Sequence, residues 1–238
     1  MTFPEGEQLV LEGVPPSSLS TPASLYSAGI PCFTAGTLIE TARGPCPVET
    51  LRVGDLLQTA DNGLQQVMWV GISHIEGAAL RANPRLRPIT LQPGGILNLP
   101  HPMTVSRQHR FVLNDTDQAE LFLRANQLHQ LAPEQAQSHC PQHGVTYVHV
   151  LLERHEVIFA GGIPTESFYP GPWSLRGLSN DAQAELTSLL PDLRALRPLH
   201  PRLARIATDK IYSPLARKEI STADLGMRIT PVRLQRHA

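Results

Sequence analysis

The chain has 238 residues, enough for one large domain or two small ones with a substantial core. Its formal net charge of -1 at pH 7 argues against a general nucleic-acid binder, so no nucleic-acid partner is expected. The 22 prolines argue against long helices and favour short strands with frequent turns.

The sequence contains no run of about 18 apolar residues, so no membrane span is expected. It also lacks the basic start and apolar core of a secretory signal, which predicts a cytoplasmic location or export by a signal-independent route. The three cysteines, Cys32, Cys46 and Cys140, form neither an even disulfide framework nor a CxxC pair. At least one free thiol is therefore expected.

Residues 1–30 form a polar segment rich in Pro and Ser, with three acidic residues and no Lys or Arg. Such a composition predicts a flexible leader.

Residues 33–170 are predicted to be all-β, because short apolar runs alternate with turn residues about every ten positions. Asp61-Asn62-Gly63 predicts a hairpin turn, since Asn-Gly readily takes the left-handed conformation that tight turns require. The expected strands span residues 37–41, 47–59, 64–75, 87–91, 103–113, 120–128 and 147–160.

Residues 171–238 have a different character. Ser179-Asn180 predicts the cap of a helix over 181–190, and Pro191 either ends this helix or begins another. Beyond residue 200, eight Lys or Arg face three acids, which indicates a solvated basic tail or a helical appendage.

Cys32 is the first candidate for chemistry. It follows Pro31 and precedes a small-residue turn and a short strand, in the run Pro-Cys-Phe-Thr-Ala-Gly-Thr-Leu-Ile-Glu-Thr. A thiol is a good nucleophile near neutral pH because a few per cent is already thiolate. Attack on the Pro31 carbonyl would convert the amide to a thioester, and this needs an acid for the departing nitrogen and donors for the oxyanion.

Two later segments hold the other candidates. An imidazole such as that of His109, in Ser106-x-x-His109, can donate and take back a proton near neutral pH, although an exposed strand histidine would show the same pattern. His149 and His155 lie on an apolar run that ends in a Gly turn. For His149, a core or surface position is the preferred interpretation.

Residues 138–143 include His139, Cys140 and His143, three possible metal ligands. No paired ligand motif accompanies them, so neither a metal nor another cofactor is expected.

Taken in order, these blocks resemble the Hedgehog/intein (Hint) autoprocessing family, in particular its bacterial members. The similarity covers the cysteine block, the Leu51-x-x-Gly54-Asp55 step, the Ser106-x-x-His109 block and the segment 157–167. It implies an all-β, horseshoe-like fold with an approximate internal two-fold and a small helical C-terminal appendage. It also implies a leader over 1–30, a Hint domain over 31–170 and a helical, basic extension over 171–238.

The resemblance implies roles for individual residues. Cys32 would attack the bond between Pro31 and Cys32, Ser106 would polarise that bond, and His109 would protonate the leaving nitrogen. His155 matches a family histidine that lies near the active centre. The substrate would be the chain's own N-terminal segment, and the acceptor would be water or a small nucleophile.

One departure from splicing inteins limits the expected chemistry. Those proteins end in His-Asn followed by Cys, Ser or Thr, whereas the corresponding positions here are Thr165, Glu166 and Ser167. A carboxylate is a poor nucleophile for the cyclisation that Asn performs. Ser167 is a possible acyl acceptor, but nothing would then release it, so an N–S acyl shift without full splicing is expected.

Two alternatives remain open. The first is a catalytically inert Hint-fold module that serves as a scaffold or attachment domain of a surface or secreted protein. The second is a conventional cysteine hydrolase that uses Cys32 and His109 on an external substrate and turns over repeatedly.

Overall fold

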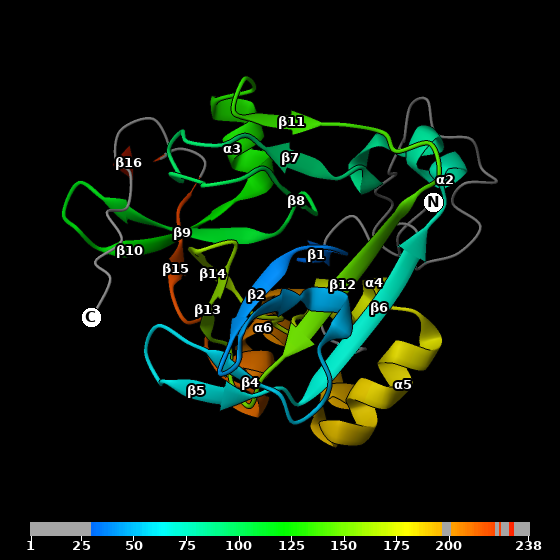
Figure 1. The fold of residues 1–238 in the computed structure, drawn as a ribbon. Helices are drawn as coiled ribbons and strands as arrows, with labels where there is room; N and C mark the ends of the chain where they lie inside the picture. The colour runs from blue at the N-terminus through cyan, green and yellow to red at the C-terminus, as the bar shows by residue number, and fades with distance from the viewer. Residues whose placement is uncertain (1–29, 197–200, 222–223, 225–228, 231–238) are drawn as a thin grey trace.

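The computed structural model describes residues 30–196, 201–221, 224 and 229–230 (Figure 1). Residues 1–29 of the leader predicted over 1–30, and the end of the basic tail, lie outside the described residues. Within the described part of the chain, no helix has the length and apolar character needed to cross a membrane.

Two antiparallel sheets form most of the described structure. The first has six strands, and its order places the short strand β1 between β8 and β12. In sheet order these strands are β11 (Ala136–Ser138), β7 (Ile89–Leu91), β8 (Met103–Val105), β1 (Phe33–Thr34), β12 (Val145–Leu151) and β6 (Trp69–Ile75).

The second sheet carries the remaining strands, and only β15 joins it in parallel. Its order is β15 (Lys218–Glu219), β10 (Glu120–Arg124), β9 (Arg110–Asp115), β14 (Ile163–Glu166), β13 (Val157–Ala160), β2 (Leu38–Thr41), β4 (Leu56–Gln58) and β5 (Leu64–Gln66). Two further strands pair beside this path, β3 (Gly44–Pro47) with β2 and β16 (Ile229–Thr230) with β9.

Three predicted strands, over 64–75, 103–113 and 147–160, prove to be two strands each. In every case one half lies in the first sheet and the other in the second: β6 with β5, β8 with β9, and β12 with β13. A chain that leaves one sheet and enters the other at a bend makes a corner between them. These three corners fold the two sheets around a common core and produce the curled shape in Figure 1.

Two smaller predictions have different outcomes. The hairpin at Asp61-Asn62-Gly63 is confirmed, because Gln58 pairs with Leu64 and Gly63 takes a φ of 63°. The strand predicted over 120–128 is wrong beyond Arg124, where helix α3 (Ala125–Leu131) begins. The side chain of Gln127 accepts a hydrogen bond from the Arg124 N–H and so caps this helix.

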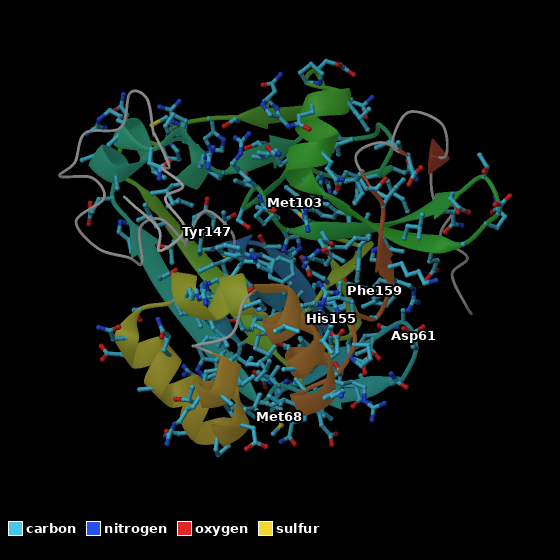
Figure 2. The ribbon with its side chains drawn as sticks, turned by 180° about the vertical axis from the view of Figure 1, so that it is seen from behind. Asp61, Met68, Met103, Tyr147, His155 and Phe159 are labelled. Atoms are coloured by element: carbon cyan, nitrogen blue, oxygen red, sulfur yellow. The ribbon has the colours of Figure 1, made fainter. Side chains whose placement is uncertain are left out.

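The C-terminal helices lie against one face of the sheets (Figure 2). The predicted helix over 181–190 is confirmed as α5 (Asn180–Leu189), with the Ser179 side chain accepting from the Ala182 N–H. The others are α4 (Pro172–Gly177), the 3-10 turn η5 (Pro191–Leu196) and α6 (Pro201–Ile211). Elsewhere lie α2 (Gly77–Ala82) and the 3-10 turns η3 (Val48–Thr50) and η4 (Pro84–Leu86).

Buried apolar side chains form two main clusters. The larger fills the space between the two sheets and includes Phe111 and Ile158. The second lies between the first sheet and the C-terminal helices, and it includes Cys32 together with Trp69 and Leu186. The cysteine thus sits where sheet and helices meet.

Candidate active site

The register of β1 places Cys32 between two polar side chains. Phe33 pairs with Val148 of β12 on one side and with Val105 of β8 on the other. Because both pairs are antiparallel, Cys32, which precedes Phe33, lies beside His149, which follows Val148, and beside Ser106, which follows Val105. The Ser106 N–H donates to the Cys32 carbonyl at 3.0 Å, which extends the ladder by one residue.

His149 contacts both reacting groups of the Pro31–Cys32 bond. Its Nδ1 lies 3.2 Å from the Pro31 carbonyl oxygen, and because a carbonyl only accepts, Nδ1 carries the proton. The unprotonated Nε2 lies 3.7 Å from the Cys32 Sγ. A single neutral ring can thus polarise the carbonyl and accept the thiol proton.

Ser106 fixes the peptide on the opposite side. Its Oγ accepts from the Cys32 N–H at 2.9 Å and donates to the Ile30 carbonyl at 2.8 Å. The Cys32 thiol also lies within reach of that carbonyl, at 3.3 Å. The Cys32 N–H and the carbonyls of Ile30, Pro31 and Cys32 are therefore all held by hydrogen bonds.

His109 lies in the same turn as Ser106, since its N–H donates to the Ser106 carbonyl. Thr165 donates its hydroxyl proton to the Arg110 carbonyl at 2.7 Å, so it accepts from His109 Nε2–H at 2.5 Å. The buried Nδ1 is then unprotonated, and it has no hydrogen-bond partner among the described residues. The ring packs against Phe33, the residue after the cysteine, at a centroid distance of 4.4 Å.

Burial sets the protonation states of the site. It raises the pKa of the Cys32 thiol well above its ordinary value, an effect that the Ser106 hydrogen bond opposes. It lowers the pKa of His149 to about 4 and that of His109 to about 4. At neutral pH the site therefore holds a thiol and two neutral imidazoles.

The contacts of His155 are made with other residues than those around Cys32. Its Nδ1 accepts from the Ala216 N–H at 3.0 Å, and its Nε2 faces Glu166 at 3.4 Å. Its ring packs edge-on against Phe122 and Tyr169, beside α6 in Figure 2. Because β12 ends at Leu151 and β13 begins at Val157, His149 and His155 do not share one regular strand.

The three residues at the position of an intein's end have structural partners. Glu166 forms an ion pair with Arg110 and also accepts from the Arg110 N–H at 2.8 Å. Burial alone would raise the pKa of Glu166, but Arg110 and the His155 hydrogen bond outweigh it and lower that pKa. The Ser167 hydroxyl, the predicted acyl acceptor, accepts a hydrogen bond from the Glu156 N–H at 2.9 Å. This bond directs the hydroxyl to the 152–156 loop.

Other residues considered from the sequence lie outside the site. Asp55 pairs with Arg43 at 2.8 Å in a surface turn, as a structural carboxylate would. His139 Nδ1 forms a hydrogen bond with the Thr90 hydroxyl at 3.1 Å. Among the residues that the structure describes, no three His, Cys, Asp or Glu side chains gather as a metal-ligand set.

The contact of His149 with the Pro31–Cys32 bond was not predicted from the sequence pattern. The rings of Trp69 and Phe168 cover His149, with centroid distances of 6.4 Å and 5.2 Å. The available signal was the cross-strand register, since an apolar strand carrying one central histidine can pair with the strand that begins at the cysteine.

The fold and the site define an all-β, intein-like domain that begins at a buried cysteine and holds its own preceding peptide bond. The Hint domain model matches residues 31–172, more than half of the chain, so this protein belongs to the Hint domain family. The predicted family and fold class are thereby confirmed. No curated protein matches the sequence.

The chain is also similar to solved structures, at low sequence identity and over a little more than half of its length. The chain is similar to a bacterial intein-like domain from Clostridium thermocellum, with 13% identity, a TM-score of 0.37 and coverage of 58% of this chain and 97% of that chain. A DnaB intein from Synechocystis sp. PCC 6803 gives 10% identity and a TM-score of 0.39, covering 58% and 98%. The gp41-1 intein gives 12% identity and a TM-score of 0.37, covering 57% and 97%.

Proposed function

We propose that this protein is an autoprocessing domain that performs an N–S acyl shift at the Pro31–Cys32 bond and then releases or transfers its N-terminal segment. The observation that supports this most directly is the placement of one His149 ring against both the Pro31 carbonyl and the Cys32 thiol. In this organisation residues 1–30 are the leader, 31–170 the Hint domain and 171–238 an extension.

In the first step Sγ of Cys32 attacks the Pro31 carbonyl carbon while its proton passes to His149 Nε2. The carbonyl oxygen becomes an oxyanion, and His149 Nδ1–H, already directed at it, stabilises the charge. The imidazolium that forms strengthens this hydrogen bond because a charged donor faces a charged acceptor.

In the second step the carbon–nitrogen bond breaks and the nitrogen of Cys32 takes up a proton. We assign the donor role to His109, whose turn also holds the Ser106 acceptor of that N–H. Its free Nδ1 accepts a proton from water and delivers it to the nitrogen, while the His149 imidazolium returns the thiol proton to water. One proton leaves sulfur and one reaches nitrogen, so the shift yields a thioester and a free amine without net proton change.

In the third step an external nucleophile resolves the thioester. Water would give a carboxylic acid on residues 1–31 and regenerate the Cys32 thiol, whereas a small amine or thiol would take the acyl group. Splicing is not part of the proposal, because Glu166 is held by Arg110 and the Ser167 hydroxyl by Glu156. His155 is given a structural role in the same ion-pair network.

The test is the intact mass of the purified chain under denaturing conditions, with and without hydroxylamine, beside Cys32→Ala. We expect loss of residues 1–31 as the acid or the hydroxamate, faster with hydroxylamine and absent in Cys32→Ala. A folded parent that keeps its full mass in every condition would favour an inert Hint-fold scaffold instead.

A further inference from the structure

The helices that follow the Hint match form part of the wall around the scissile bond. The family match ends at residue 172, and α4, α5, η5 and α6 follow it. We refer to these four segments as the cover. Leu175, Leu186 and Leu193 of the cover share one buried cluster with Ile30 and Cys32.

The cover is attached to the residues that surround His149. The Trp69 indole N–H donates to Glu185 on α5 at 3.0 Å, and the same indole stacks on His149. On α6, Asp209 accepts from the hydroxyl of Tyr169 at 2.6 Å, and Tyr169 directly follows Phe168, whose ring packs on His149. These bonds fix the helices over the site, where Cys32 is only 4% exposed.

Ile30 is the residue that the cover and the site hold together. Its side chain is 4% exposed within the apolar cluster, and its carbonyl accepts from the Ser106 hydroxyl. Both the side chain and the backbone of Ile30, two residues before the nucleophile, are thus held in place. A charged or polar side chain at position 30 would lose its water in this cluster without a hydrogen-bond partner in return.

We infer that the cover is a substrate-recognition element, which selects an apolar residue at position 30 and closes the scissile bond from bulk solvent. This inference rests on the proposed function for its meaning in catalysis, but the closure can be measured without any cleavage. An apolar residue at position 30 keeps the cover shut and the bond in register. A polar one opens the cover and displaces the bond from His149.

The test starts from a variant in which Cys46→Ser and Cys140→Ser leave Cys32 as the only cysteine. N-ethylmaleimide labelling of the full-length species is followed by intact mass, and hydroxylamine-dependent loss of 1–31 is followed in parallel. Along the series Ile30→Val, Ile30→Ser and Ile30→Asp, labelling should become faster, by at least about tenfold for Asp, while cleavage slows.

Two substitutions on α5, one buried and one exposed, test the cover by changing the cover itself. Leu186 is 0% exposed in the cluster and Leu189 is 39% exposed on the outer face. Leu186→Ala should speed labelling by about tenfold, while Leu189→Ala should leave it unchanged. This second route keeps the test valid if Ile30→Asp fails to fold cooperatively.

The outcomes separate the two proposals. If no variant is cleaved but labelling follows the series, the cover stands and the proposed function fails. If cleavage proceeds while labelling and cleavage are the same for Ile, Ser and Asp at position 30 and for both α5 variants, the inference is overturned.

Discussion

At the scale of single residues, hydrogen-bond direction determines what each histidine can do. A carbonyl oxygen can only accept, so the Pro31 carbonyl leaves His149 Nε2 free for the thiol proton. The Thr165 hydroxyl donates to the Arg110 carbonyl and therefore accepts from His109 Nε2–H. The proton of the neutral ring is thus on Nε2, which leaves His109 Nδ1 unprotonated. Two backbone carbonyls thereby leave one unprotonated ring nitrogen on each of the two histidines.

His149→Asn is expected to slow hydroxylamine-dependent cleavage by about 10²–10³-fold. Asn keeps an N–H near the position of Nδ1, facing the Pro31 carbonyl, but has no group in place of the Nε2 base. The rate is measured from intact mass against time. His139→Asn, at a histidine that contacts Thr90, serves as the control and should keep the parental rate. An unchanged rate in His149→Asn would remove this residue from the mechanism.

The buried neutral histidines predict a stability that falls with acid. Their folded pKa values of about 4 lie below the ordinary 6.5, so the unfolded chain binds more protons as pH falls through that window. The stabilisation is complete above pH 6.5 and lost toward pH 4.

When the pH is lowered from 7.5 to 5, His109 and His149 should each reduce the unfolding free energy by about 2 kcal/mol. Urea unfolding of Cys32→Ser, which cannot release the leader as a thioester, measures this loss. His109→Gln should remove the share of one such histidine, about 2 kcal/mol over this range. A stability that is flat across this range would contradict the buried neutral state of the rings.

At the scale of secondary-structure elements, β6 and β12 control the position of the Trp69 ring. Gly71 lies opposite His149 across these two strands. A Cβ built on Gly71 would lie 2.1 Å from the Trp69 ring, so the indole occupies the space that a side chain would need. The absence of a side chain at position 71 thus lets Trp69 reach both His149 and Glu185.

Gly71→Ala is therefore expected to displace the indole and cost about 1–3 kcal/mol of unfolding free energy through overpacking. Tryptophan fluorescence should shift as the ring moves, and urea unfolding gives the energy. Ile72→Ala, on the exposed face of the same strand, should change neither measurement. Native fluorescence and stability in Gly71→Ala would contradict the tight contact.

The buried ion pair between β9 and β14 is a second element-scale feature. Glu166→Gln leaves Arg110 without its buried counter-charge and should cost about 3–5 kcal/mol, even though Glu219 on β15 remains. Asp55→Asn in the exposed pair with Arg43 is the control and should cost less than about 1 kcal/mol. Urea unfolding distinguishes the pairs; equal small losses would show that Arg110–Glu166 contributes little.

At the scale of the whole molecule, the sequence predicted the family and the fold class because ordered short motifs survive in local sequence. Cys32, Ser106 and His109 could be named from these motifs, and the structure brings Cys32 and Ser106 into direct contact. His149 could not be assigned, because its partnership with Cys32 depends on a strand register across 117 positions and on where the chain turns between sheets. The corners at 67–68, 106–109 and 152–156 have no strong breaker pattern, so the strands predicted there run through the bends.

The burial of Ile30 and Pro31 has a consequence for how a processed molecule would behave. Both residues belong to the leader side of the bond, yet both are packed inside the domain. Cutting the backbone does not unpack them, so the product would be a nicked complex with slow dissociation. Gel filtration in native buffer should then report an undiminished particle size after processing, and only denaturation would separate the two pieces.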